Sequence, residues 1–295
     1  MSPTIGTLAG EAAAALRAAG IEEARLQADL LLADVLCISR TALRLDPGRE
    51  VDEAAQSRYR GLLERRLRRE PLQYILGEVH FRELRLRVDQ RVLIPRPETE
   101  VLAGAVLDWA GARGRGGAVA DIGTGSGAIA LSLAAEGAFD RVVATDVSAA
   151  ALEVARDNAV ALGLAGRVSF REGSLYGAFE KGERFDAIVS NPPYVAESEA
   201  GALAAEVRDW EPAGALFADA AGFGVLFALT DGGAGRLVPG GVLALEVGLG
   251  QADAVARRML KHGFCNVRVL PDLAGVERIV LGERAPDGGP AEGAR

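Results

Sequence analysis

Beyond Pro97 the chain alternates short apolar runs with helical segments, and this alternation restricts the possible fold more than any other feature. Strands that alternate with helices predict a parallel sheet covered by helices on both faces. Two further strand candidates, "NVRVLPD" and "ERIVLGE", follow each other closely and indicate an antiparallel pair at a sheet edge. The apolar runs lie at 117–122, 141–146, 167–171, 185–190 and 240–248. We therefore expect an α/β domain with a mostly parallel sheet over 96–284.

The first part of the chain has a different periodicity. From residue 7 to about 72, apolar residues recur at helical spacing, which predicts a small helical bundle domain over 1–73. Residues 74–95 alternate apolar and polar positions and predict a β-hairpin linker. The Gly- and Pro-rich segment 285–295 has no apolar anchor, so we expect a disordered tail.

The charge balance argues against broad binding of a polyanion, because the formal net charge is −8. No stable DNA binding is expected. The exception is the arginine-rich segment 58–69, "RYRGLLERRLRR". This segment is either a contact for RNA or an acidic partner, or the solvated face of a helix.

Cysteine and histidine usage excludes several classes of chemistry. Cys37 and Cys265 are far apart, so neither a disulfide framework nor a metal site is expected. His80 and His262 do not suggest histidine acid–base catalysis. No signal segment and no run of about 18 apolar residues is present, so we expect a cytoplasmic protein that does not enter the membrane.

A glycine-rich loop, "AVADIGTGSGAIA", follows the first predicted strand and opens a helix. Gly123, Gly125 and Gly127 allow a tight turn and a close approach of the backbone to a ligand. Asp146 ends the next strand, where a carboxylate can bind both hydroxyls of a ribose. Together these features predict a cofactor of the adenosine type, the alternative being a structural turn and a helix-capping Asp.

The identity of the cofactor follows from the charge of this loop. Gly123, Gly125 and Ala128 also fit the dinucleotide pattern G-x-G-x-x-G/A, which leaves a nicotinamide cofactor as an alternative. However, Asp121 precedes the glycines, where its carboxylate would repel a pyrophosphate and attract an ammonium group. S-adenosylmethionine has an ammonium, a sulfonium and no phosphate, so this cofactor is favoured.

The tetrapeptide Asn191, Pro192, Pro193 and Tyr194 follows the apolar run "FDAIV" and is expected at the carboxyl edge of the sheet. The Asn191 side-chain oxygen and the Pro192 carbonyl can accept the two N–H bonds of a planar amino group and orient its lone pair. The prolines keep the backbone rigid and supply no competing N–H. Tyr194 offers a flat surface for stacking, so the motif predicts methyl transfer to an amide or a base.

These motifs resemble a known family. "DIGTGSG", "ATD" and "NPPY" resemble class I S-adenosylmethionine-dependent amino-methyltransferases. "PLQYILGEVHF", "VLIPRPETE" and "EVRDWEPAGALFA" resemble the protein-(glutamine-N5) methyltransferases of peptide chain release factors, the PrmC/HemK family. The resemblance covers nearly the whole chain. It implies a Rossmann-like, mostly parallel seven-stranded sheet, an N-terminal substrate-docking domain and a catalytic domain over 96–284.

The same resemblance implies the substrate and the role of each site residue. The acceptor would be the glutamine of the release-factor Gly-Gly-Gln motif, and the product S-adenosylhomocysteine. The glycine loop would hold the methionine part, next to the Asp121 carboxylate that its charge already suggests for the ammonium group, while Asp146 would hold the ribose and Leu175 the adenine. The tetrapeptide would hold the glutamine, and Asn191 would also border the cofactor. The loop residues are Gly123, Thr124, Gly125, Ser126 and Gly127.

Three alternatives stay open at this point. A related enzyme methylates a glutamine of a ribosomal protein, although "IPRPETE" favours the release-factor enzyme. Adenine-N6 methylation of nucleic acid would use the same tetrapeptide, and a non-catalytic module could dock through the helical domain.

Glu246, at the end of "LALE", is either a carboxylate behind the site or an exposed strand end.

Overall fold

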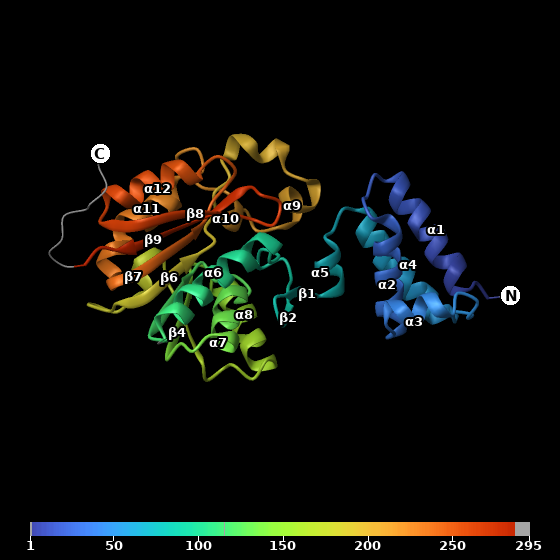
Figure 1. Ribbon diagram of the computed structural model, residues 1–295. Coiled ribbons are helices and arrows are strands. Elements are labelled where there is room, and N and C mark those ends of the chain that lie inside the picture. The colour runs from blue at the N-terminus through green and yellow to red at the C-terminus, as the bar shows by residue number, and fades with distance from the viewer. Residues whose placement is uncertain (1, 115, 287–295) are drawn as a thin grey trace. The chain divides into compact units, whose positions relative to one another are not determined.

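The computed structural model of the protein describes residues 2–114 and 116–286 (Figure 1). The chain packs into two compact units. The first holds the residues up to Gly77 together with Ala204–Trp210, and the second holds Glu78–Leu203 together with the residues from Glu211 on. This division differs from the expected boundaries, because Ala204–Trp210 packs with the N-terminal helices and the hairpin packs with the second unit. From residue 287 on, the expected tail lies outside the described residues.

The first unit is a bundle of helices, three of which begin at polar N-caps. Thr4, Ser39 and Asp52 each accept a hydrogen bond from the backbone N–H three residues later, at 3.4, 3.1 and 2.8 Å. Each bond satisfies one amide of the first helical turn. In the core, the buried Tyr59 hydroxyl donates to the Ala28 carbonyl at 3.0 Å. The helices are α1 (Ile5–Ala18), α2 (Ala24–Leu36), α3 (Arg40–Leu45), α4 (Glu53–Leu67), α5 (Leu72–Leu76) and α9 (Ala205–Trp210). The predicted helical N-terminal region is confirmed.

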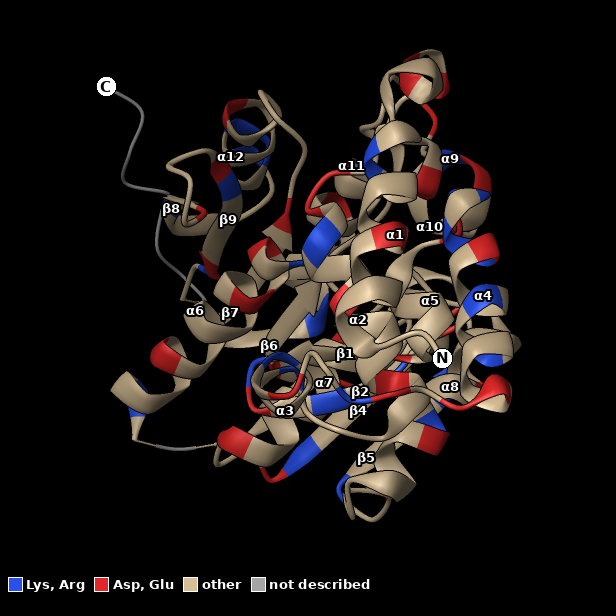
Figure 2. Ribbon diagram, turned by 90° about the vertical axis from the view of Figure 1, so that its right-hand side faces the viewer, with Lys and Arg blue, Asp and Glu red and all other residues tan. Residues whose placement is uncertain are grey.

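The arginine-rich segment 58–69 lies on α4 and directly after it, and Figure 2 marks both signs of charge along this helix. Arg66 is only 5% exposed. Its guanidinium donates to Gln27 Oε1 at 2.7 Å and to Glu206 Oε1 at 2.8 Å. Arg69 donates to the same Glu206 oxygen at 3.1 Å. These two arginines therefore fasten α9 to the bundle and are not a solvated helix face.

The second unit is built on a seven-stranded sheet with the order β5-β4-β3-β6-β7-β9-β8. Neighbouring strands from β5 to β7 are parallel, and β9 is antiparallel to both β7 and β8. The predicted fold, mostly parallel with an antiparallel pair at one edge, is confirmed. The strands are β3 (Ala118–Ile122), β4 (Arg141–Asp146), β5 (Val168–Glu172), β6 (Phe185–Ser190), β7 (Leu237–Glu246), β8 (Phe264–Pro271) and β9 (Glu277–Arg284). A separate hairpin consists of β1 (Glu78–Phe81) and β2 (Leu84–Arg87).

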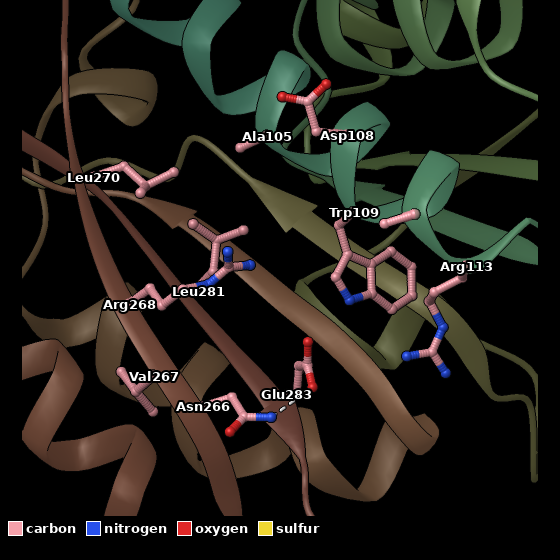
Figure 3. Close-up of a pocket in the computed structure, with 11 residues that line it drawn as sticks. Ala105, Asp108, Trp109, Arg113, Asn266, Val267, Arg268, Leu270, Leu281 and Glu283 are labelled. Atoms are coloured by element: carbon pink, nitrogen blue, oxygen red, sulfur yellow. Dashed lines mark hydrogen bonds between the residues drawn. The ribbon is translucent and has the colours of Figure 1, made fainter.

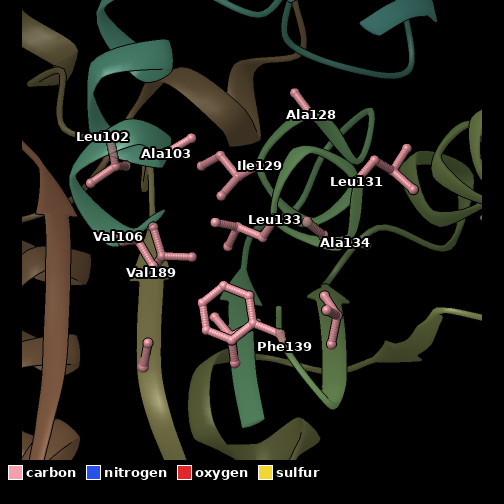
Figure 4. Close-up of a cluster of buried hydrophobic side chains, with 14 of the residues drawn as sticks. Leu102, Ala103, Val106, Ala128, Ile129, Leu131, Leu133, Ala134, Phe139 and Val189 are labelled. Carbon is pink, nitrogen blue, oxygen red and sulfur yellow. The ribbon is translucent and has the colours of Figure 1, made fainter. Parts of the chain in front are cut away.

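Helices cover both faces of this sheet (Figure 1). Successive side chains of a strand point to opposite faces. Accordingly, Val119 packs in the cluster with α6 and α7, part of which is drawn in Figure 4, and Ala120 packs in the cluster with α11 and α12. The helices are α6 (Pro97–Arg113), α7 (Ala128–Glu136), α8 (Ala149–Ala161), α10 (Ala213–Leu216), α11 (Gly224–Gly233) and α12 (Ala252–Lys261), with 3₁₀ turns η1 (Leu175–Ala178), η2 (Glu197–Ala202) and η3 (Ala234–Arg236).

The fastening of α9 is testable by a pair of substitutions on α4. Arg66→Ala removes a buried guanidinium and leaves Gln27 and Glu206 without one partner each, so we expect a loss of about 1–3 kcal/mol of unfolding free energy in urea. Arg60→Ala, at an exposed position of the same helix, should change stability by less than about 0.5 kcal/mol. Equal effects of the two substitutions would contradict this account of Arg66.

Candidate active site

The segments marked by sequence analysis leave neighbouring strands at the same edge of the sheet. Strands β5, β4, β3 and β6 are adjacent and parallel. The glycine loop follows β3, Asp146 ends β4, Leu175 follows β5 and Asn191 follows β6. Because the carboxyl ends of parallel strands share one edge, the structure brings these segments together. This edge is where open α/β sheets bind their ligands.

Three glycines in the left-handed region shape the loop between β3 and α7. The φ angle is 74° at Gly123, 55° at Gly125 and 86° at Gly127. A Cβ added at Gly123 or Gly125 would meet no heavy atom within 4 Å. At Gly127 it would lie 2.9 Å from Leu131 and 3.3 Å from Ala155. The first two glycines therefore border open space for a ligand, and the third allows α7 and α8 to pack closely.

The polar residues of this loop brace its shape. Thr124 and Ser126 are 6% and 2% exposed. The Thr124 backbone N–H donates to the Thr145 carbonyl at 2.9 Å, and the Ser126 carbonyl accepts from Asn158 Nδ2 at 2.9 Å. Asn158 could not be predicted from the sequence, because its only signal is a polar amide within the apolar pattern of α8. The loop is thus held from the neighbouring strand and helix.

Asp121 is a fully buried carboxyl group near the end of β3. Its Oδ2 accepts hydrogen bonds from the Thr124 hydroxyl at 2.6 Å and from the Ala130 N–H at 3.1 Å. Oδ1 has no partner in the part of the chain that the structure describes. Burial raises the pKa of Asp121 to about 7, against the lowering effect of the two hydrogen bonds. A cationic group beside Oδ1 would supply the missing partner and favour the ionised form.

Asp146 holds the glycine loop from the adjacent strand. Its Oδ2 accepts from the Gly125 N–H at 2.9 Å, and its Oδ1 accepts from the Ser148 N–H at 2.9 Å. Each oxygen of an ionised carboxyl group can accept a second hydrogen bond. Asp146 therefore keeps acceptor capacity for a diol while it fixes the loop that the diol would border.

Leu175 begins η1 with a φ of 50°, which places a branched side chain in the left-handed region. This backbone conformation is uncommon for residues other than glycine and is found preferentially at functional sites. The preceding turn is tied to β4, because the Gly173 N–H donates to the Asp146 carbonyl at 2.9 Å. Leu175 therefore lies on the side of the site next to Asp146.

The side chain of Asn191 is tied to the first turn of α6. Its Nδ2 donates to Thr99 Oγ1 at 3.0 Å, and the Thr99 hydroxyl donates to Glu246 Oε2 at 2.7 Å. The Tyr194 hydroxyl donates to the other oxygen of Glu246 at 3.3 Å. Gln251 Nε2 donates a hydrogen bond to the Tyr194 carbonyl oxygen at 3.1 Å. One carboxyl group thus supports two residues of the tetrapeptide.

Glu246 is 1% exposed, so the alternative of an exposed strand end is wrong. Burial raises the pKa of Glu246 to about 7, although the hydrogen bonds from Thr99 and Tyr194 lower it. Burial likewise raises the pKa of Tyr194, and the Glu246 charge adds to this effect. The role of Thr99 could not be predicted from the sequence, because polar residues are common in the first turn of a helix.

The tetrapeptide presents two oxygens without a partner. Pro192 is buried and Pro193 is half-buried, and neither ring nitrogen can donate a hydrogen bond. Over residues 2–114 and 116–286, no hydrogen bond is made to Asn191 Oδ1 or to the Pro192 carbonyl oxygen. Both oxygens can therefore accept hydrogen bonds from a ligand.

A cavity of about 640 Å³ lies elsewhere in the second unit (Figure 3). Trp109 and Arg113 of α6 and Asn266 and Arg268 of β8 are among its lining residues. None of the predicted site residues lines it. Trp109 is about 15 Å further along α6 than Thr99, at 1.5 Å per residue. The cavity is therefore distinct from the candidate site.

Within the described residues, no cluster of three or more His, Cys, Asp or Glu side chains is arranged to hold a metal ion. In the same part of the chain, no helix has the length and apolar character that crossing a membrane requires.

Known proteins resemble this chain over nearly its full length. Residues 8–77 match the PrmC N-terminal domain, and residues 99–208 match the methyltransferase small domain. The release factor glutamine methyltransferase of Koribacter versatilis is 42% identical over 269 residues, which are 91% of this chain and 94% of that protein. That of Moorella thermoacetica is 42% identical over 282 residues, which are 95% and 99%. The chain belongs to the release factor glutamine methyltransferase family.

The fold agrees with this family assignment. A solved methyltransferase structure from Pyrococcus furiosus superposes with a TM-score of 0.52 at 21% identity, over 68% of this chain and 89% of that chain. The likeness is one of fold. Together with the match to the methyltransferase small domain, it confirms the predicted class I methyltransferase fold.

The raised pKa of Asp121 predicts a pH-dependent stability. The folded protein keeps the Asp121 proton up to about pH 7, whereas an unfolded Asp releases it near its usual pKa of about 4. The folded protein therefore binds more protons than the unfolded chain between these pH values, and the free energy of unfolding of the wild type decreases as pH rises through them. Asp121→Asn lacks this contribution, so its stability relative to wild type should increase from pH 5 to pH 8 in urea unfolding.

Asp108→Asn, at an exposed position of α6, is the control and should show no such pH dependence. If Asp121→Asn also gave the same stability difference from wild type at both pH values, a raised pKa of Asp121 would be ruled out.

Proposed function

We propose that this chain transfers the methyl group of S-adenosylmethionine to the side-chain nitrogen of the glutamine in the Gly-Gly-Gln motif of peptide chain release factors. The product would be S-adenosylhomocysteine. The observation that carries this proposal is the pair of unpartnered oxygens, Asn191 Oδ1 and the Pro192 carbonyl, at the sheet edge next to the glycine loop. The names of the relatives support the choice of substrate.

The residues of the loop fit S-adenosylmethionine, which supplies a methyl group on a positively charged sulfur. The unpartnered Asp121 Oδ1 is suited to its ammonium group. The open space at Gly123 and Gly125 leaves room for the methionine chain. Asp146 has acceptor capacity for the ribose hydroxyls, and Leu175 lies next to it, on the side where we place the adenine. A pyrophosphate beside Asp121 would instead meet a buried carboxyl group, which disfavours the nicotinamide alternative.

The tetrapeptide would activate the acceptor by orienting it. An amide nitrogen is a poor nucleophile because its lone pair is delocalised into the carbonyl. Two fixed acceptors, Asn191 Oδ1 and the Pro192 carbonyl, can hold both N–H bonds and direct the lone pair at the methyl group. They also stabilise the positive charge that develops on the nitrogen. The electron pair of the broken C–S bond stays on the sulfur of S-adenosylhomocysteine, and the methylated amide then releases one N–H proton to water. Tyr194 would hold the plane of the amide by stacking.

The alternative substrates have less support. An adenine-N6 methyltransferase needs a positive channel for phosphates. The net charge of this chain is −8, and Arg66 and Arg69 of the arginine-rich segment are bound to Glu206. A ribosomal protein would present the same glutamine amide, so this alternative differs only in docking.

We assign release-factor docking to the helical unit, on the basis of the match of residues 8–77 to the PrmC N-terminal domain. The hairpin within residues 74–95 would act as the linker to the catalytic domain. Because release factors act on the ribosome, the proposal includes a cytoplasmic location.

The proposal predicts that a release factor incubated with the protein and S-adenosylmethionine gains the mass of one methyl group on the Gly-Gly-Gln glutamine, as located by mass spectrometry. Asn191→Ala removes one acceptor, so its rate should fall at least about 100-fold. Asn266→Ala, which removes an amide that binds Glu283 on β9, is the matched control and should keep the wild-type rate within about twofold.

Parallel reactions with a ribosomal protein extract and with DNA distinguish the alternatives. Label on either of these and not on the release factor would overturn the proposed substrate. A wild-type rate for Asn191→Ala would overturn the role of the tetrapeptide.

A further inference from the structure

Thr99 can support Asn191 in only one way as long as Glu246 is ionised. An ionised carboxyl group only accepts hydrogen bonds, so the single hydroxyl hydrogen of Thr99 must point at Glu246. Thr99 Oγ1 can then only accept, and the group that it accepts from is the NH₂ of Asn191 at 3.0 Å. The carbonyl oxygen of Asn191 is consequently turned away from Thr99. The hydrogen bonds from Asn191 to Thr99 and from Thr99 to Glu246 form a relay. The direction of these two bonds fixes which end of the Asn191 amide faces the ligand.

A proton on Glu246 reverses this direction. A protonated Oε2 can donate to Thr99 Oγ1, and the Thr99 hydroxyl can then donate to the carbonyl oxygen of Asn191. The amide would turn, and its NH₂ group would face the acceptor nitrogen. Two N–H donors facing each other cannot form a hydrogen bond, so this orientation is not productive.

We propose that Glu246 and Thr99 are positioning residues for methyl transfer, and that the ionised Glu246 holds Asn191 in its productive orientation through Thr99. This inference rests on the proposed function. It gives both residues a role although neither faces the substrate, since Thr99 is 4% exposed and Glu246 is 1% exposed. The relay joins β7, α6 and the end of β6, which lie far apart in the sequence.

The surroundings of Glu246 set the pH range of this effect. Burial raises its pKa to about 7, and Glu98 at the start of α6 raises it further. Arg278 on β9 and the hydrogen bonds from Thr99 and Tyr194 lower it. Glu246 therefore loses its charge as pH falls through about 7. The productive orientation should be lost over the same range.

Three variants at the relay test the proposal with a purified release factor as substrate. Thr99→Val keeps the shape and removes the hydroxyl, so kcat should fall roughly 10- to 100-fold, in the range expected for a misplaced catalytic group. The affinity for S-adenosylmethionine, measured by calorimetry, should not change. Thr99→Ser restores the hydroxyl and should restore kcat.

Glu246→Gln provides the readout that a structural role would not give. Its neutral amide can donate or accept, as the protonated carboxyl group can, but it does not titrate, so kcat should lose the wild-type decrease below about pH 7 and stay at one value across this pH range. Two matched controls keep the wild-type kcat and pH profile. Thr230→Val removes a buried hydroxyl that bonds within α11, and Glu183→Gln alters a carboxyl group that binds Arg171 at 2.7 Å.

A second measurement does not depend on the substrate. In ¹⁵N-labelled protein, the side-chain NH₂ resonance of Asn191 should titrate near pH 7 in wild type and stay constant in Glu246→Gln. If this titration is present but no release factor is methylated, the proposed function fails and the relay stands. If release factors are methylated while Thr99→Val keeps the wild-type kcat and the resonance does not titrate, the relay is overturned and the function stands.

Discussion

Parallel pairing of the four strands β5, β4, β3 and β6 is the constraint on which the rest of the site depends. These strands are apolar because helices cover both faces of the sheet, so ligand-binding groups can emerge only where the strands end. The order 5-4-3-6 places Leu175, Asp146, the glycine loop and Asn191 in one row along that edge. A donor and an acceptor bound along this row would meet at the glycine loop and the tetrapeptide.

Two buried carboxyl groups give this edge its chemical character. Asp121 is the last residue but one of β3, and Glu246 is the last residue of β7. Burial raises the pKa of both carboxyl groups to about 7. Such groups lower stability, because ionisation in a dry environment is unfavourable. We propose that binding and orientation explain their retention: the unpartnered oxygen of Asp121 would bind a cation, and Glu246 would set the direction of the hydrogen bonds to Asn191 through Thr99. Neither group needs to remove a proton from the substrate.

The parts of the site that are local in sequence could be predicted, and the parts that join distant segments could not. The glycine loop and Asp146 belong to consecutive strand–loop–helix units, so their spacing already indicates their arrangement. Thr99 and Asn191 are 92 positions apart, and Thr99 and Glu246 are 147 positions apart, so no spacing rule connects them. For the same reason, the sequence could not show whether the arginines of α4 are exposed or paired. Arg66 binds Glu206, which lies 140 positions later in the chain. Charge patterns in a sequence do not show which distant segment will neutralise them.

We propose that two fixed oxygens activate an unreactive amide by accepting its N–H bonds. The most direct measurement is a crystal structure of the protein with S-adenosylhomocysteine and a release-factor domain that contains the Gly-Gly-Gln motif. We expect Asn191 Oδ1 and the Pro192 carbonyl oxygen each to lie about 3 Å from the glutamine nitrogen, with Thr99 bound to Asn191 Nδ2. A complex in which the Asn191 oxygen faces Thr99, or in which the glutamine nitrogen contacts neither oxygen, would contradict the account.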